Sequence, residues 1–299
     1  MPQLHPSWQL SFVTAAVLAS VHVAGRLRAR GGVPAHRAEA AVTAFAREFA
    51  LVASLLGIWQ LIGGLVHTRI AGATERGYRI AHLQDALGLP AEQHLQRLAG
   101  AWPPLLHAAD VFYAYAHLNG TAVFVVWLWW RHRDVYPRMR AVLVGSTLAC
   151  LLVQLVPVAP PRMLADLGFV DTALQDGTSV YGPFGSGIAN QLSAMPSVHV
   201  AWAFLVAWYV GWNAPPRWRW IGPAHLGVTV LVVVVTANHW WADGAVAVGL
   251  AAVAMVVVDA VRRLAARPAP GGVSGAVRPP LADPGPVPRR AADPALPGS

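Results

Sequence analysis

Residues 226–261 read L-G-V-T-V-L-V-V-V-V-T-A-N-H-W-W-A-D-G-A-V-A-V-G-L-A-A-V-A-M-V-V-V-D-A-V. This stretch belongs to two apolar runs, 219–237 and 240–261, which flank a short polar segment containing Asn238 and His239. Each run is close to the roughly 20 apolar residues that an α-helix needs to cross a bilayer. The stretch therefore predicts two membrane-spanning helices joined by a tight polar connection.

Five more apolar runs of similar length precede this pair. They cover approximately residues 8–25, 46–66, 105–130, 139–158 and 197–212. The whole chain is 56% hydrophobic and only 12% charged, whereas soluble proteins carry about 25% charged residues. These observations predict an all-α fold, a polytopic membrane helical bundle with about seven transmembrane helices. They exclude a separate soluble catalytic domain.

Arginine supplies all of the positive charge, because the chain has no lysine and a net charge of +8. Arginines follow the first, third, fifth and seventh runs, at Arg26, Arg28, Arg30, Arg37, Arg131, Arg133, Arg138, Arg140, Arg217, Arg219, Arg262, Arg263 and Arg267. Since cytoplasmic loops carry an excess of basic residues, we expect these connections in the cytoplasm and loops 159–196 and 237–240 outside. Charges spread over several loops form no basic face, so we expect no nucleic-acid partner.

The chain divides into three predicted parts. Residues 1–45 hold an N-terminal anchor helix and a cytoplasmic loop, and residues 46–263 form the membrane domain. Residues 264–299 are rich in Pro, Ala and Arg without apolar periodicity, so we expect a disordered cytoplasmic tail. Loop 67–104 mixes arginines with acidic residues and has leucines at helical spacing, which favours an amphipathic helix along the membrane interface.

Three polar groups lie at the predicted outer ends of the fourth, fifth and seventh runs. The first is Arg162, which follows Pro160-Pro161 and is the one basic residue of loop 159–196. A guanidinium is permanently charged and presents a planar set of donors suited to phosphate oxygens. The alternative is an interfacial arginine that binds lipid headgroups.

The second group, Met195-Pro196-Ser197-Val198-His199, begins the fifth run. Proline suits the first turn of a helix, so Ser197 and His199 fall at a helix N-terminus whose N–H groups favour anions. Ser197 can donate to a phosphate oxygen there, and His199 can transfer a proton near neutral pH. The alternative is a capped helix start with an ordinary interfacial histidine.

The third group, Asn238-His239-Trp240-Trp241-Ala242-Asp243, opens the seventh run. His239 and Asp243 are four residues apart, which places them on one helix face within hydrogen-bond reach. A carboxylate on one imidazole nitrogen fixes the tautomer and makes the other nitrogen a better base or nucleophile. The alternative is a structural pair, although a carboxylate beside lipid is costly to keep without a function.

A polar stripe also follows the third run at intervals of three and four residues. It comprises His107, Asp110, Tyr113, Ala114, His117 and Thr121. Such a stripe is expected to face the interior of the bundle. Two interpretations stay open: Asp110, Tyr113 and His117 bind a headgroup and select the acceptor, or the stripe holds neighbouring helices together through hydrogen bonds.

The order Arg162, P-S-V-H at 196–199 and H-x-x-x-D at 239–243 resembles the type 2 phosphatidic acid phosphatase superfamily, which includes the vanadium haloperoxidases. The match covers about residues 105–261. Within it, A-P-P-R-M-L, G-F-V-D-T, A-M-P-S-V-H-V-A-W and T-A-N-H-W-W-A-D look most like bacterial relatives of inositol phosphorylceramide synthase. The resemblance implies a six-helix core and a membrane enzyme that transfers phosphoryl groups without a metal or other cofactor.

The resemblance also implies a role for each matching residue. His239 is then the nucleophile that forms a phosphohistidine, and Asp243 orients and activates it. His199 protonates the leaving oxygen and later deprotonates the acceptor. Arg162 and Ser197 hold the phosphate oxygens and stabilise the transition state.

Two departures from the phosphatase pattern bear on the activity. Leu155 stands where the first phosphatase motif has lysine, and Val232 and Val233 replace the serine and arginine of the third motif. With these cations missing, the sequence favours transfer from a diester, with a lipid-linked phosphate as substrate and a polar or lipid acceptor. A lipid phosphate or polyprenyl pyrophosphate phosphatase of the same superfamily is the alternative. A catalytically silent membrane protein that binds lipid phosphate is the alternative from another class.

These inferences also predict a location. The active site is expected on the extracytoplasmic face of an integral membrane protein, surrounded by membrane lipids. Abundant alanine and arginine without lysine are typical of a GC-rich bacterial coding sequence, which favours a bacterial cell membrane.

Overall fold

The computed structural model describes residues 8–32, 36–66, 71–175 and 191–266, and helices make up most of this part of the chain. The helices are α1 (Trp8–Arg30), α2 (Arg37–Val66), α3 (Ala73–Ala86), α4 (Glu92–Gly100), α5 (Pro103–Val111), α6 (His117–Arg131), α7 (Tyr136–Val153), α8 (Thr172–Gln175), α10 (Val198–Asn213), α11 (Ile221–Val235) and α12 (Trp241–Ala265). A π-helical turn, Phe112–Ala116, joins α5 to α6. The described residues contain no strand, only one isolated bridge between Val158 and Ser193.

The predicted all-α membrane bundle is confirmed, with six helices long and apolar enough to cross a membrane. They are α1, α2, the continuous α5–α6 segment, α7, α11 with its preceding turn, and α12. The remaining predicted span, 197–212, corresponds to α10, which has 16 residues. At 1.5 Å per residue it is about 24 Å long, somewhat shorter than a hydrocarbon core of roughly 30 Å. The predicted fifth span is therefore a helix that is shorter than the six candidate spans.

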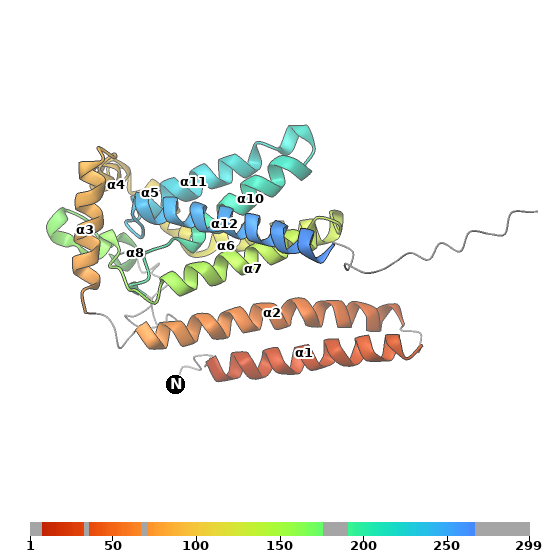
Figure 1. The fold of residues 1–299 in the computed structure, drawn as a ribbon. Coiled ribbons are helices and arrows are strands. Elements are labelled where there is room, and N and C mark those ends of the chain that lie inside the picture. Colours follow the sequence, from red (N-terminus) through yellow and green to blue (C-terminus); the bar gives the residue numbers. More distant parts are fainter. Residues whose placement is uncertain (1–7, 33–35, 67–70, 176–190, 267–299) are drawn as a thin grey trace, which may run out of the picture.

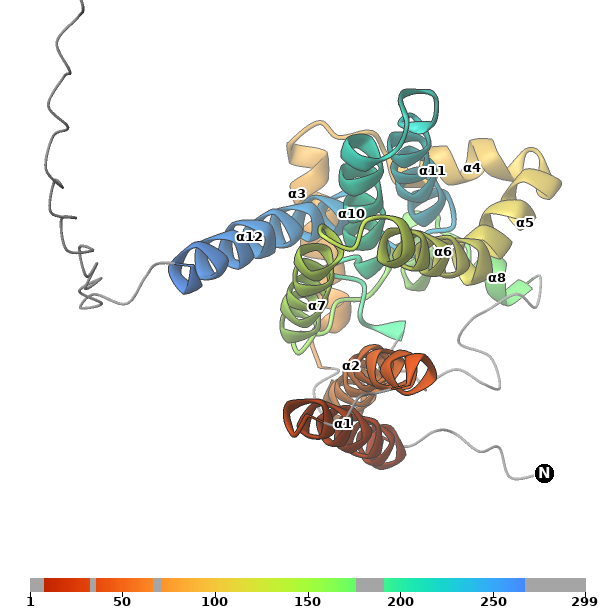
Figure 2. The ribbon, with the colours of Figure 1, turned by 90° about the vertical axis from the view of Figure 1, so that its right-hand side faces the viewer.

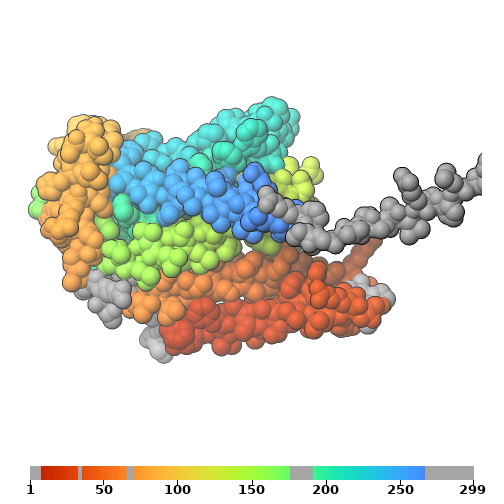
Figure 3. Space-filling model, in the orientation of Figure 1, coloured from red at the N-terminus to blue at the C-terminus, as the bar shows by residue number. Residues whose placement is uncertain are grey.

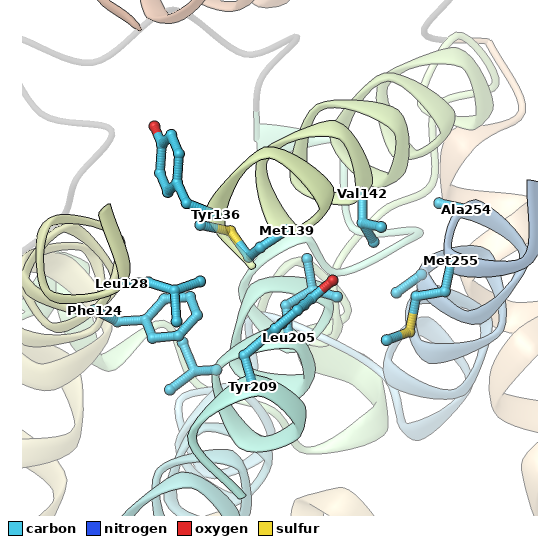
Figure 4. Packing of buried hydrophobic residues seen from close by; sticks show 11 residues of the cluster. Phe124, Leu128, Tyr136, Met139, Val142, Leu205, Tyr209, Ala254 and Met255 are labelled. Atoms are coloured by element: carbon cyan, nitrogen blue, oxygen red, sulfur yellow. The ribbon is translucent and has the colours of Figure 1, made fainter. Parts of the chain in front are cut away.

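The short α10 lies at the centre of the bundle. Its Ala201, Ala203 and Leu205 are completely buried. Apolar side chains of α6, α7, α10 and α12 meet around Leu205 and Met139, as Figure 4 shows. One side of α10 is therefore covered by neighbouring helices, while Trp208 and Trp212 are exposed toward its C-terminal end.

Helices α1 and α2 form a hairpin on one side of this bundle (Figures 1 and 2). In the space-filling view of Figure 3 the hairpin is a separate band along the α7 side. Polar contacts connect it to the bundle, because the Tyr136 hydroxyl and the Arg140 guanidinium of α7 both donate to Glu48 of α2, each at 2.6 Å. The cytoplasmic loop expected within 1–45 is shorter than predicted, because α2 already begins at Arg37.

The two ends of the bundle carry different elements. The α1–α2, α6–α7 and α10–α11 connections and the C-terminus of α12 lie at one end, which we call the arginine end (Figure 1). Arg28, Arg131, Arg217 and Arg262 lie in its helix termini and turns. Helices α3 and α4 lie across the opposite end, where an amphipathic helix was expected. The predicted tail lies outside the described residues from position 267 onward.

Candidate active site

The first turns of α10 and α12 meet at the end of the bundle opposite the arginine end. The Ser197 N–H donates to the backbone carbonyl of Asp243 at 3.2 Å. The Ser197 hydroxyl accepts a hydrogen bond from the Val200 N–H at 3.3 Å, so it caps α10. Ser197 is completely buried. The predicted cap at the start of this helix is therefore confirmed, and it brings two of the three predicted groups together.

His239 lies in the connection between α11 and α12, where the backbone turns sharply. The N–H groups of Asn238 and His239 both donate to the Val233 carbonyl, each at 3.1 Å. Ala237 has a left-handed φ of 53°, which is uncommon for a residue with a side chain. The Nδ1 atom of His239 lies 2.7 Å from the Ala194 carbonyl oxygen. Because a carbonyl oxygen only accepts, we assign the proton to Nδ1 and the lone pair to Nε2.

The Ala194 carbonyl is itself fixed by backbone contacts. The Ala194 N–H donates to the Val158 carbonyl at 3.3 Å, and the Val158 N–H donates to the Leu192 carbonyl at 2.7 Å. The segment before α10 is thus attached to the segment after α7. This places a backbone acceptor against the His239 ring, and no side-chain motif in the sequence could have revealed it.

Asp243 lies close to His239, as predicted, but the two do not share a helix face, because α12 begins at Trp241 and His239 precedes it. The shorter hydrogen bond of the Asp243 carboxylate is to another group. Its Oδ2 atom is 3.4 Å from Nδ1 of His239 and accepts a shorter hydrogen bond, 2.8 Å, from the Trp240 N–H. Asp243 is completely buried, and its Oδ1 atom has no hydrogen-bond partner among the described residues. The carboxylate therefore caps α12 and places negative charge beside the imidazole, while the Ala194 carbonyl makes the shorter contact with Nδ1.

His199 lies between His239 and the α5–α6 segment. Its ring centroid is 5.9 Å from that of His239. It stacks on Tyr113 with centroids 4.3 Å apart and an interplanar angle of 26°. The centroid of the His117 ring, on α6, lies 5.0 Å from that of the His199 ring. The imidazole rings of His199 and His239 thus lie close together, and Tyr113 packs against the His199 ring.

Arg162 lies in a 3-10 turn, Pro161–Met163, and is only 6% exposed. Its backbone N–H donates to the Ala237 carbonyl at 2.9 Å, which attaches this turn to the connection that carries His239. Its Nε atom is 3.7 Å from a carboxylate oxygen of Asp171, an ion pair. The structure therefore brings Arg162, the first of the three predicted groups, to the same end of the bundle as the other two. It also places beside it Asp171, an acidic partner that the spacing did not indicate.

The polar stripe of the third run faces the interior, as expected, at Asp110, Tyr113 and His117, which are 1%, 7% and 1% exposed. His107 differs from this prediction because it is exposed. The His117 ring stacks almost parallel, at 4°, on His225 of α11, with centroids 5.2 Å apart. The row of rings thus continues from His199 through His117 to His225, and His225 was not among the predicted site residues.

A buried polar cluster next to the site was also missed. Glu92 of α4 and Gln84 of α3 contact the first residues of α12, immediately after His239. Burial raises the pKa of the Glu92 carboxyl, and the hydrogen bond from the Trp241 N–H opposes this only in part. The signal available in the sequence was an acidic residue within an amphipathic segment, which is too common to mark a site.

Comparison with known proteins adds a family. Among the described residues, no group of three or more ligating side chains is placed to hold a metal ion. No curated protein and no solved structure gave a match. Residues 78–257, more than half of the chain, match the PAP2 superfamily. Members of this superfamily are generally phosphatases or phosphotransferases. The match runs from within α3 to within α12 and includes the three polar groups described above, and the chain therefore belongs to the PAP2 superfamily.

Proposed function

We propose that this protein is an integral membrane phosphotransferase that moves a phosphoryl or substituted phosphoryl group from a lipid-linked phosphate through a phosphohistidine at His239. The observation that carries the proposal is the contact between Nδ1 of His239 and the Ala194 carbonyl, 2.7 Å. This contact leaves Nε2 with its lone pair, which is the form a nucleophilic imidazole needs. The second imidazole, His199, lies across the same site.

The chemistry follows in two balanced steps. In the first, Nε2 of His239 attacks phosphorus, a nitrogen–phosphorus bond forms, the bond to the leaving oxygen breaks, and protonated His199 gives that oxygen its proton. In the second, neutral His199 removes the proton of the acceptor hydroxyl, whose oxygen attacks phosphorus and displaces His239. Arg162 and Ser197 hold the phosphate oxygens and stabilise the charge of the transition state.

Two observations favour a diester donor, such as a phosphoinositide in an inositol-phosphate-type transfer, over a phosphate monoester. A monoester carries more negative charge and needs more cations. The positions that hold two of those cations in phosphatases, a lysine and an arginine, are Leu155 and Val233 in this chain, and Val232 replaces the neighbouring serine. Val232 and Val233 are buried on α11, with exposures of 8% and 2%. Arg162 is then the principal cation of the site.

The placement of the arginines supports an extracytoplasmic site in a cell membrane. The arginine-bearing connections lie at one end of the bundle, and α3, α4 and the site lie at the other (Figure 1). Because basic loops stay in the cytoplasm, the site then faces the outside. A cysteine-reactive, membrane-impermeant reagent would test this on a single cysteine introduced at the exposed His82, after Cys150 is replaced by serine.

The decisive experiment compares wild type with His239→Ala, and with His82→Ala on the exposed surface of α3 as the matched control. Each purified protein receives phosphatidylinositol, phosphatidic acid and polyprenyl pyrophosphate, with inositol and diacylglycerol as acceptors, and the products are identified by mass spectrometry. A phosphorylated acceptor made by wild type and His82→Ala, but not by His239→Ala, supports the transferase. We expect the loss to be at least about 10⁴-fold, because the nucleophile is removed.

The other outcomes decide between the alternatives. Inorganic phosphate released only by the proteins that retain His239 would assign a phosphatase instead. No product from any of the three proteins, with the lipids bound but unchanged, would favour a binding protein without turnover.

A further inference from the structure

The first turn of α12 is capped by side chains from two other helices. The Trp241 N–H donates to Oε1 of Glu92 at 3.1 Å, and the Ala242 N–H donates to Oε1 of Gln84 at 2.8 Å. The Gln84 amide donates to the same Glu92 oxygen at 2.7 Å. Glu92 and Gln84 are 5% and 3% exposed. Two buried side chains of α4 and α3 therefore satisfy the N–H groups of Trp241 and Ala242, while the Trp240 N–H, which directly follows His239, donates to Asp243.

These contacts add to the cap that Asp243 provides by accepting from the Trp240 N–H. The first N–H groups of a helix have no acceptor within the helix and usually bond to a Ser, Thr, Asp or Asn at its start. Trp240 stands at that position in α12, and its indole N–H donates to the Ala159 carbonyl at 3.1 Å. A carboxylate at a helix N-terminus is also favourable to the helix dipole. The geometry at the start of α12 thus depends on where α4 places Glu92.

The same face of α4 makes a second contact one turn later. The Gln96 side chain accepts from the Val170 N–H at 3.0 Å and donates to the Val170 carbonyl at 2.8 Å. Val170 precedes Asp171, whose carboxylate pairs with Arg162. Gln96 is 4% exposed. One helix face therefore contacts both the segment that follows the histidine and the segment beside the arginine.

We propose that α4, together with Gln84 of α3, is a clamp that sets the position of His239 relative to Arg162. Glu92 is the positioning residue for the histidine, and Gln96 is the positioning residue for the arginine. The inference rests on the proposed function, because it assigns the clamp to the phosphoryl transfer at His239. A buried cluster that only attached α3 and α4 to the bundle would have no reason to contact these two segments in particular.

The test uses three variants of the clamp and one control. Glu92→Ala removes the acceptor for Trp241, Glu92→Gln keeps an oxygen there, and Gln96→Ala removes the contact with Val170. Glu75→Ala is the control, since Glu75 is 61% exposed and pairs with Arg79. The readouts are single-turnover phosphorylation of His239 by the labelled lipid donor, steady-state kcat and KM, and hydrogen exchange of the amides of Trp241 and Ala242.

For Glu92→Ala we expect phosphorylation about 10²-fold slower, because a displacement near 1 Å costs about that much. Its KM should stay within about threefold, and the exchange of the two amides should rise about tenfold, as expected for a lost cap. Glu92→Gln and the control should stay close to wild type on every readout. Gln96→Ala should instead raise KM about tenfold with a smaller change in kcat, because it releases the segment beside the phosphate-binding arginine.

Three results would overturn the clamp. One is unchanged amide exchange in Glu92→Ala, and another is faster exchange with an unchanged rate of phosphorylation. The third is an equal loss of rate in Glu92→Gln and Glu92→Ala. If Glu92→Ala does not fold, Glu92→Asp, which withdraws the carboxylate by one methylene, takes its place with the same expected order. If wild type transfers no phosphoryl group from any lipid, the proposed function fails, while the amide exchange still shows whether the contacts exist.

Discussion

Charged side chains at the two ends of the bundle differ in the distance to their partners and in burial. At the arginine end, the Arg138 guanidinium makes a two-pronged hydrogen bond to the Asp259 carboxylate at 2.6 and 2.7 Å. At the site end, the corresponding distances are longer: 3.4 Å between His239 and Asp243, and 3.7 Å between Arg162 and Asp171. The groups at the site end are also more deeply buried: the side chains of Arg162 and Asp243 are 2% and 0% exposed, against 27% for Arg138.

We interpret this difference as one between a structural arrangement and the proposed functional one. Short pairs on α7 connect helices, since Arg138 contacts Asp259 of α12 and Arg140 contacts Glu48 of α2. Buried charges at longer distances gain less from each other and cost more to desolvate. An anionic substrate that binds beside these groups would offset the cost of their burial. The predictions below test whether the loose pairs serve catalysis and the short pairs serve stability.

Among substitutions in these charged pairs, the largest effect is expected from Arg162→Gln. The substitution removes the principal cation of the site, and kcat/KM should fall by about 10²–10³-fold, the usual cost of removing one charge-stabilising donor from a transition state. Arg162→Lys should recover only part of it, because an ammonium lacks the planar donor set. Steady-state assays with the lipid donor that the mass-spectrometry experiment identifies would measure both, with the exposed Arg79→Gln as control. Wild-type kinetics in Arg162→Gln would place the phosphate elsewhere.

Asp243→Asn should have a smaller effect, a loss of about tenfold in kcat. The asparagine oxygen can still accept from the Trp240 N–H, and the Ala194 carbonyl still holds the proton on Nδ1 of His239. In a dyad where the carboxylate alone fixes the tautomer, the same change costs about 10⁴-fold. A loss of that larger size, measured in single turnovers, would show that Asp243 and not the Ala194 carbonyl orients the imidazole.

The contrast between the two ends also explains what the sequence could predict. Apolar runs predicted the helices because the length of a membrane span is set by the bilayer. The motif residues Arg162, Ser197 and His239 were found because their order and positions at span ends are local features of the chain. Shared burial and neighbouring contacts then confirmed that their segments meet at one end.

The partners of these residues could not be predicted in the same way. The Ala194 carbonyl and Asp171 contact the site only because distant segments meet, and neither has a distinctive spacing. Glu92 lies in a short amphipathic helix among other charged residues, and only burial distinguishes it from them. The predicted bounds of α10 were shifted by one residue, because its apolar run includes Ser197, which caps the helix and lies outside it.

The smallest effect is expected at the arginine end, from Asp259→Asn. The substitution breaks the charge pairing with Arg138 while leaving an oxygen for a neutral hydrogen bond. Because the pair is about 30% exposed, we expect a loss of roughly 1 kcal/mol or less in the free energy of unfolding. This corresponds to a fall of a few degrees in Tm. Thermal unfolding in detergent would measure it, and kcat and KM should stay within about twofold of wild type. A large loss of activity with normal Tm would mean that the arginine end takes part in turnover, and the proposed division between the two ends would be wrong.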